Sequence, residues 1–173
     1  MDKHTLIVII ASIVIAIPFV YSGLNIYAAS QLQFHGTDED RFRFFDMIND
    51  GSIKACNPSP FFGNFNKLNI VTYFDSDNIG TFSSKPISVS PLSSVVINGM
   101  FSSESFPEAQ YFALHFDGIF SGSSPERIDP RRLMIVTEIE TPIIGIIPYT
   151  VTKQYSGLYF WETLNGDIGE FNC

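Results

Sequence analysis

An apolar stretch near the amino terminus sets the strongest limit on how this chain folds. Residues 5–27, TLIVIIASIVIAIPFVYSGLNIY, contain no charged side chain. A helix rises about 1.5 Å per residue, so about 20 apolar residues span the ~30 Å hydrocarbon core of a bilayer. We therefore expect a transmembrane helix over residues 5–28, which contacts the lipid bilayer and follows a short cytoplasmic start at residues 1–4.

A cleaved signal peptide is the alternative to an anchor. Lys3 gives a short basic start, and Ala28, Ala29 and Ser30 offer small side chains to a peptidase. The apolar run, however, continues past Val20, and an h-region usually extends over only about 7–15 residues. Tyr27 is an aromatic residue of the kind found at membrane interfaces. We favour an uncleaved signal-anchor.

The charges that flank the apolar stretch indicate its orientation. Lys3 and the amino terminus precede it, whereas Asp38, Glu39 and Asp40 follow it. The positive-inside rule then leaves the amino terminus in the cytoplasm. We expect a single-pass protein of the cell membrane, with a polar stalk at residues 29–40 and an extracytoplasmic domain at residues 41–173.

The composition limits what this domain binds. The chain has a formal net charge of −8 over 173 residues, and its ten Lys and Arg residues form no basic run. Phosphate groups repel an acidic surface, so we expect no nucleic-acid partner. Residues 41–173 are enough for one domain with a buried core.

Short stretches of alternating apolar and polar residues predict strands. The clearest one is residues 65–74; others are 52–56, 79–84, 95–101, 111–120, 133–139 and 157–161, with Gly, Pro and Ser between them. Residues 41–48 fit either a strand or a helix. Many short strands at this spacing predict an all-β fold, an antiparallel β-sandwich preceded by one transmembrane helix.

Four segments carry a resemblance to a known family. They are Ile53–Pro58 (IKACNP), Leu68–Tyr73 (LNIVTY), Ile79–Gly80 and Ser90–Ile97 (SPLSSVVI). Together they resemble the late-embryogenesis-abundant type-2 domain of the water-stress and hypersensitive-response group, and also uncharacterised archaeal membrane proteins. The resemblance implies an immunoglobulin-like β-sandwich behind a membrane helix, and it implies no catalytic residue. Residues 127–173 depart from the pattern.

The search for catalytic, cofactor and metal sites identifies none. His115 stands alone in a predicted strand, and Glu138 and Glu140 share one strand face without a second sign of acid–base chemistry. Residues 75–80 (DSDNIG) start like a calcium loop, but Ile79 and Pro86 take ligand positions, so a hairpin turn is the better interpretation. We expect no enzyme activity and no cofactor.

Two apolar segments are candidates for a partner or ligand surface. The chain is rich in aromatic residues, with 17 Phe, 7 Tyr and one Trp, and most of them are expected in the core. Phe61 and Phe62 follow the Asn57-Pro58 turn. A second segment contains Ile143, Ile144, Ile146 and Ile147 between two prolines, and it suits neither a central strand nor an open loop.

The two cysteines, Cys56 and Cys173, predict a disulfide if the domain lies outside the cytoplasm. Such a bond would hold the carboxyl terminus against the first sheet. The alternative is a small buried thiol at Cys56 and an incidental thiol at Cys173.

Three functions follow from these observations. The first is a membrane-tethered, non-catalytic β-sandwich that binds a protein partner or contributes to an envelope or membrane assembly. The second is a module that binds a lipid or another apolar ligand. The third and least favoured is a hydrolase with an unrecognised site.

Overall fold

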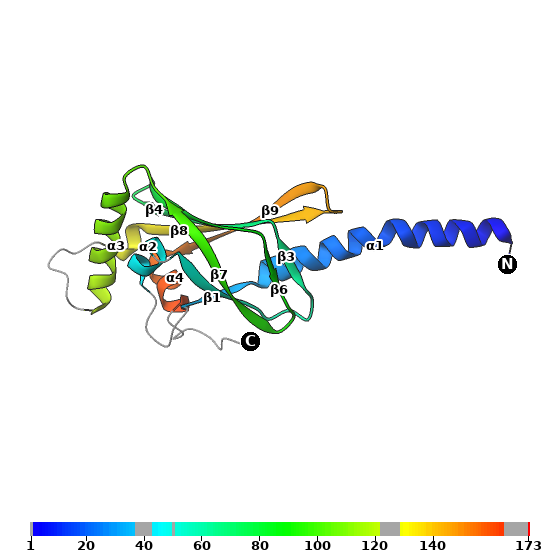
Figure 1. Cartoon of the computed structure of the whole chain (residues 1–173), viewed down its shortest axis with the longest axis horizontal. Helices are drawn as coiled ribbons and strands as arrows, with labels where there is room; N and C mark the ends of the chain where they lie inside the picture. The colour runs from blue at the N-terminus through cyan, green and yellow to red at the C-terminus, as the bar shows by residue number, and fades with distance from the viewer. Residues whose placement is uncertain (1, 37–42, 50, 122–128, 165–172) are drawn as a thin grey trace.

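A computed structural model describes residues 2–36, 43–49, 51–121, 129–164 and 173. It contains one long helix, an antiparallel sheet and shorter helices (Figure 1). The predicted class, an all-β fold preceded by one long apolar helix, is confirmed. The elements are α1 (Lys3–Gln31), β1 (Gln33–His35), α2 (Phe44–Asn49), β2 (Ser52–Asn57), β3 (Gly63–Phe65), β4 (Lys67–Phe74), β5 (Asp77–Ser84), β6 (Ile87–Val89), β7 (Ser93–Ser102), α3 (Phe106–Ser121), the 3-10 turn η1 (Pro130–Arg132), β8 (Leu133–Ile143), β9 (Ile147–Ser156) and α4 (Gly157–Leu164).

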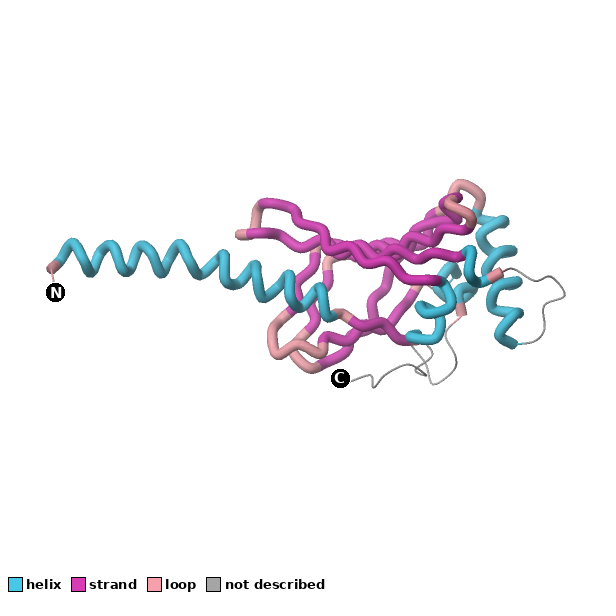
Figure 2. Tube along the Cα trace, turned by 180° about the vertical axis from the view of Figure 1, so that it is seen from behind, coloured by secondary structure: helices cyan, strands magenta, loops and turns pink. Residues whose placement is uncertain are grey.

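The main sheet has seven antiparallel strands in the order β1-β2-β7-β5-β4-β8-β9, and β3 pairs with β6 in a separate two-stranded ribbon. The long sheet curls, so that its concave face holds the core (Figures 1 and 2). The fold therefore does not consist of two full sheets packed face to face. The seven-stranded sheet is one layer, and helices, including the end of α1, supply much of the second layer.

Alternation along the strands explains the sheet. Leu68 and Ile70 of β4 are buried, and they lie opposite Ile139 and Thr137 of β8. Side chains of successive residues point to opposite faces, so one face of each strand packs inward. The expected hairpin at residues 75–78 is present: Asp75 and Ser76 have φ of 50° and 76°, as a type I′ turn requires.

Helices α2, α3 and α4 gather at one end of the sheet (Figure 1) and contribute aromatic side chains to the core. Phe44 of α2 meets Phe116 of α3 edge to face, with ring centroids 5.1 Å apart, and lies 6.3 Å from Phe160 of α4. Such pairs add to the stabilisation that burial of their apolar area provides. Most of the phenylalanine richness is therefore used in packing.

Two predicted strands are helices. Residues 111–120 lie in α3 and residues 157–161 lie in α4. In α3 the buried residues Ala109, Phe112, Ala113 and Phe116 repeat at helical spacing. Phe112, Leu114 and Phe116 also alternate, and that shorter pattern favoured the strand. Of the ambiguous residues 41–48, residues 44–48 lie in helix α2, and residues 41–42 lie outside the described part of the chain.

The expected polar stalk at residues 29–40 is wrong in its first part. Ala29, Leu32 and Phe34 are buried, and Phe34 of β1 pairs with Ala55 of β2. These residues complete α1 and add an edge strand to the sheet. Burial of three apolar side chains lowers the free energy relative to their exposure to water on a stalk. Residues 37–40 lie outside the described part of the chain.

The predicted disulfide is present between Cys56 and Cys173, with Cα atoms 5.9 Å apart. Cys56 is fully buried at the end of β2. The bond joins the last residue of the chain to the sheet. Residues 127–173 were the part that departs from the pattern of the similar family. Within them, residues 133–143 form β8, an interior strand between β4 and β9. Arg127 belongs to residues 122–128, which lie outside the described part of the chain.

Candidate functional site at the junction of helix and sheet

The long helix α1 changes environment within its own length. Its first two thirds project away from the sheet, and its last turns run against β3 and β8 (Figures 1 and 2). It is long and apolar enough to cross a membrane, as an anchor or a signal sequence. The exposed large apolar side chains of this helix are Leu6, Ile7, Val8, Ile9, Ile10, Ile13, Val14, Ile15, Ile17, Phe19, Val20, Tyr21 and Tyr27.

The buried part of α1 starts at Ser22 and includes Asn25, Ala28 and Ala29. Alanines allow the helix to approach the sheet closely. Ser22 and Asn25 are polar, and a buried polar group must find a hydrogen-bond partner to avoid a large desolvation cost. Both find partners on the sheet.

Asn25 joins three segments of the chain. Its Oδ1 accepts a hydrogen bond from the Asn64 backbone N–H at 2.6 Å, and its Nδ2 donates to the Asn64 carbonyl oxygen at 2.7 Å. Nδ2 also donates to Oγ1 of Thr141, which is fully buried on β8. One amide side chain thus pairs α1 with β3 and β8, in the same way that a neighbouring strand would pair with Asn64.

Ser22 makes the second connection. Its hydroxyl donates to the Pro18 carbonyl oxygen and accepts a hydrogen bond from the Ile144 N–H, both at 2.7 Å. Tyr21 extends the network outward, because its hydroxyl accepts from Nδ2 of Asn64 at 2.6 Å. We call this set of contacts the polar junction; it consists of Tyr21, Ser22, Asn25, Asn64, Thr141 and the backbone of Ile144.

The apolar segment predicted as a surface forms the end of the β8–β9 hairpin, that is, the turn at residues 144–146 and the strand residues beside it; we call residues 143–149 the hairpin tip. Ile146 is 79% exposed and Ile147 is 53% exposed, whereas Ile143 and Ile144 are half-buried. The Ile146 N–H donates to the Ile143 carbonyl oxygen at 3.1 Å. Ile144 and Gly145 both have positive φ, 48° and 79°.

The other predicted surface segment, Phe61 and Phe62, lies in the loop between β2 and β3. The Asn57 side chain organises this loop: its Nδ2 donates to the Phe61 carbonyl oxygen at 2.7 Å. Phe61 is half-buried, with its ring 6.4 Å from that of Tyr27 on α1, and Phe62 is 56% exposed. Both segments therefore contact α1, Phe61 at Tyr27 and the hairpin tip at Ser22.

The polar junction was not predicted from the sequence. A signal was present, since Ser22 and Asn25 are polar residues three positions apart in a largely apolar helix. The partners of Asn25, which are Asn64 and Thr141, lie 39 and 116 positions away from it, and Ile144 lies 122 positions away from Ser22. Only the folded chain brings them together.

His115, Glu138 and Glu140, the residues considered as catalytic candidates, each contact a neighbouring side chain. His115 lies in α3, not in a strand, with its ring 3.9 Å from that of Tyr111. On β8, Glu138 accepts from the Asn69 amide at 3.1 Å, and Glu140 lies 3.4 Å from that of Asn66. Among the described residues no group of three His, Cys, Asp or Glu side chains is placed to hold a metal ion.

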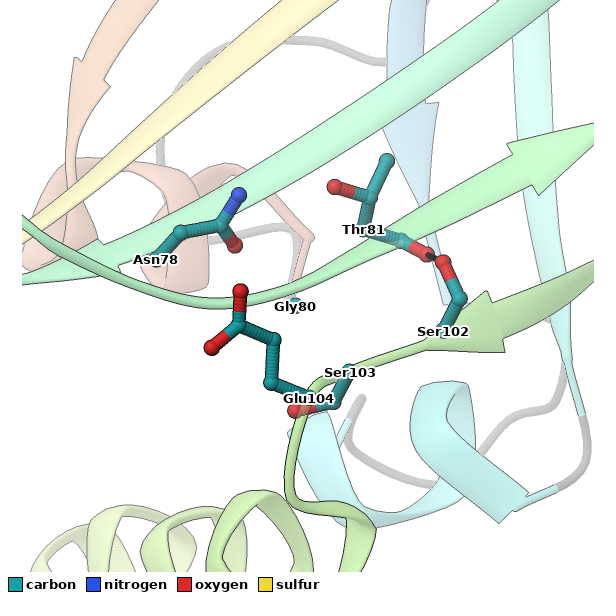
Figure 3. A pocket seen from close by; sticks show the side chains of 6 residues that line it. All are labelled: Asn78, Gly80, Thr81, Ser102, Ser103 and Glu104. Atoms are coloured by element: carbon teal, nitrogen blue, oxygen red, sulfur yellow. Dashed lines mark hydrogen bonds between the residues drawn. The ribbon is translucent and has the colours of Figure 1, made fainter.

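A polar hollow of about 290 Å³ lies between β5 and the end of β7 (Figure 3). Its lining consists of Asn78, Gly80, Thr81, Ser102, Ser103 and Glu104. The hydroxyl of Ser103 donates to the Ile79 carbonyl oxygen at 2.6 Å, and that of Ser102 donates to the Thr81 carbonyl oxygen at 3.3 Å. Both serine hydroxyls thus donate to backbone carbonyl oxygens.

Comparisons with known proteins add little. No family model matches the chain, and no curated protein matches it. A solved protein from Archaeoglobus fulgidus is 8% identical, with a TM-score of 0.32 over 72% of this chain and 94% of that one. A β-glucuronidase from Bacteroides uniformis is 10% identical, with a TM-score of 0.30 over 73% of this chain and 13% of the enzyme.

Proposed function

We propose that this chain is a single-pass membrane protein whose uncleaved helix α1 holds a non-catalytic binding domain at the outer face of the cell membrane. The observation that carries this proposal is the polar junction, in which Asn25 of α1 pairs with Asn64 and Thr141 of the domain. The end of the apolar helix is part of the domain's core.

The polar junction supports an anchor over a cleaved signal peptide. Cleavage near Ala28–Ser30 would remove Ser22 and Asn25 and leave the polar groups of Asn64 and Thr141 without these partners. An unsatisfied buried group costs about 1–3 kcal/mol. The exposed part of α1, residues 3–21, also has a length of about 28 Å at 1.5 Å per residue, close to the ~30 Å hydrocarbon core.

Alkaline carbonate extraction of native membranes tests the anchor. We expect the full-length protein to stay in the membrane pellet, with an amino-terminal peptide that starts near Met1. A soluble species that starts near Gln31 contradicts the proposal. The Ile13→Arg variant provides a matched perturbation, because a charge at the centre of the span weakens insertion by roughly 2.5–3.5 kcal/mol.

The proposed outward orientation rests on Lys3 before the helix, the acidic residues 38–40 after it, and the disulfide. Disulfides persist in oxidising compartments outside the cytoplasm. In protein prepared from native membranes with free thiols blocked, we expect Cys56 and Cys173 to react with a second alkylating reagent only after reduction. Two thiols that react without reduction argue for a cytoplasmic domain.

We propose that the domain binds a protein partner through the edge strand β9. This ten-residue strand pairs with β8 on one side, and among the described residues no strand pairs with its other edge. Thr150, Thr152 and Gln154 are exposed there. An open edge presents backbone N–H and C=O groups to which an extended segment of another chain can add.

Site-specific photo-crosslinking in cells tests this partner site. A photoreactive residue in place of Thr152 on β9 should give a defined, heavier adduct. The same residue in place of Met100 on β7, which is 78% exposed and pairs with Ser83 of β5, provides the matched control. Adducts at neither position, or equal adducts at both, contradict an interaction at the β9 edge.

We prefer a protein partner to the apolar-ligand alternative because the core accounts for the aromatic residues that suggested a ligand. Phe44, Phe82, Phe116 and Phe160 are each less than 2% exposed. Native mass spectrometry of the full chain, released from detergent, distinguishes the two. A bound lipid-sized mass that survives gentle extraction would favour the alternative.

A further inference from the structure

We infer that the hairpin tip is a second membrane contact, which lies in the outer interfacial layer of the bilayer that α1 crosses. This inference rests on the proposed anchor and adds a second point of attachment to it. The domain is then fixed to the membrane at the helix and at the turn between β8 and β9.

The position of the hairpin tip supports this contact. The β8–β9 hairpin extends beyond the other strands and points along α1 toward the amino terminus (Figures 1 and 2). The hydrogen bond from the Ile144 N–H to Ser22 Oγ, 2.7 Å long, holds its turn against α1. Ser22 follows directly on the exposed apolar part of the helix, which ends with Phe19, Val20 and Tyr21.

The chemistry of the hairpin tip suits the membrane interface. Residues 141–152 contain no charged side chain, and Ile146, Ile147 and Tyr149 are exposed at 79%, 53% and 43%. The hydrogen bond from the Ile144 N–H to Ser22 places this apolar turn next to the end of the exposed apolar part of α1. Tyrosines favour the level of the lipid headgroups, where one end of the ring is wet; Tyr21 belongs to the polar junction and Tyr149 to the hairpin tip, and both are exposed.

The backbone of the turn is also suited to an apolar layer, where every unpaired N–H or C=O group is costly. The Ile146 N–H pairs with the Ile143 carbonyl oxygen, and the Ile144 N–H pairs with Ser22. β8 and β9 pair from Ile143↔Ile147 onward. Hydrogen bonds thus already satisfy these groups before the turn meets lipid.

The identity of residue 144 gives an independent argument. Ile144 has φ of 48°, a left-handed conformation that β-branched residues rarely adopt and that water-exposed hairpins assign to Asn, Asp or Gly. Isoleucine at this position accepts backbone strain in exchange for apolar surface. Such local violations are typical of functional positions. Contact with lipid would account for an apolar residue in this conformation.

Tryptophan fluorescence in vesicles tests the contact. The full chain is reconstituted in dioleoylphosphatidylcholine vesicles, with or without a brominated phosphatidylcholine that quenches tryptophan on contact. Three single variants are compared: Ile146→Trp at the hairpin tip, Met100→Trp on β7 as the exposed control, and Val14→Trp within α1 as the inserted control. The unsubstituted chain, whose Trp161 is only 9% exposed in α4, gives the baseline.

We expect brominated lipid to quench the added fluorescence at positions 146 and 14 severalfold more than at position 100. Quenching at 14 without quenching at 146 overturns the inference and leaves the anchor intact. If brominated lipid quenches neither, both the inference and the proposed anchor are wrong. Similar quenching at 146 and 100 also overturns the inference, because the contact is then not specific to the tip.

A second variant controls for local disturbance by tryptophan. Ile147→Asp, combined with Ile146→Trp, places a charge beside the probe, and charged side chains are strongly disfavoured in the apolar layer. We expect it to lower quenching at position 146 to the level at position 100. Unchanged quenching would show that the probe, and not the native tip, enters the membrane.

Discussion

Asn25 connects helix α1 to two strands of the domain. Its amide replaces a strand's backbone in pairing with Asn64, and it also reaches Thr141. Within an apolar helix an asparagine is unfavourable unless its partners are fixed. The residue therefore specifies where α1 stops being an exposed helix and starts to be part of the domain.

We predict that Asn25→Ala lowers the free energy of unfolding by about 2–3 kcal/mol, because it leaves the backbone groups of Asn64 and the Thr141 hydroxyl with fewer partners. Chemical denaturation of the full chain in detergent micelles, followed by Trp161 fluorescence, measures the loss. Ser30→Ala is the matched control, since the Ser30 hydroxyl donates to Tyr27 within the same helix. Equal effects of the two substitutions would contradict a special role for Asn25.

The network around Asn25 also shows what a sequence leaves undetermined. The apolar stretch of α1 is local and predicts its helix directly. Asn25 pairs with Asn64 and Thr141, which lie 39 and 116 positions further along the chain, so this pairing depends on how β3 and β8 come together. No local pattern contains that information, although the two polar residues in an apolar helix are a visible sign that partners exist.

The secondary-structure elements show where local patterns were sufficient. The strand that became β4 alternates cleanly, and Asp75 and Ser76 supply the tight turn to β5. α3 was mistaken for a strand because its aromatic residues satisfy both periods over a short window. Packing of Phe112 and Phe116 against Phe74 and Phe44 then favours the helix. β1 was missed because only three residues form it.

Strand β9 has an open edge, and it also carries a residue, Lys153, that disfavours unspecific pairing with other strands. Lys153 lies opposite Thr137 on the concave face, where burial lowers its pKa from the ordinary value of 10.5. An inward-pointing charge on an edge strand disfavours contact with unrelated edges. Lys153 thus limits self-association of the strand that we propose as the partner site.

We predict that Lys153→Met stabilises the fold but increases self-association through β9. Because the folded state lowers the Lys153 pKa, the protonated side chain destabilises the fold at neutral pH, and this cost fades as pH rises through the lowered pKa toward 10.5. The melting temperature of the parent should therefore rise as the pH is raised above neutral, and that of the Lys153→Met variant should not. Melting curves from pH 7 to below about 10 and light scattering measure the two effects.

The measurement needs one control on pH. Burial raises the pKa of Tyr155, so its contribution to stability is fully present below the ordinary value of 10.0 and is lost as pH rises through the raised value. Tyr155→Phe removes that loss and separates it from the effect of Lys153. A parent protein whose melting temperature shows no rise over this range contradicts the assignment to Lys153.

The disulfide acts on the chain as a unit, because it joins residues separated by 117 positions. In the chain-entropy model a loop of this length gives about 4–5 kcal/mol as an upper figure. We predict that the Cys56→Ala, Cys173→Ser double variant loses a few kcal/mol of unfolding free energy. Denaturation with and without a reductant measures it.

A reductant should lower the midpoint of the parent and leave that of the double variant unchanged. The same loss on reduction in both proteins would mean that the reductant acts elsewhere. If neither changes, Cys173 contributes nothing to stability, and the carboxyl terminus is held by other contacts.

The unbroken passage of α1 into the sheet has a geometric consequence for assembly. A domain on a flexible tether samples many heights and tilts. This domain instead follows the tilt of its helix, because Ala29, Leu32 and Phe34, at the end of α1 and in β1, are buried in the core. Copies in one membrane, anchored as proposed, then share a single up–down polarity. Any closed ring that they form must have its rotation axis along the membrane normal, and two-fold axes in the membrane plane are forbidden. Any assembly of copies anchored in this way would therefore be lateral, a cyclic ring or a planar row, and not a dihedral particle.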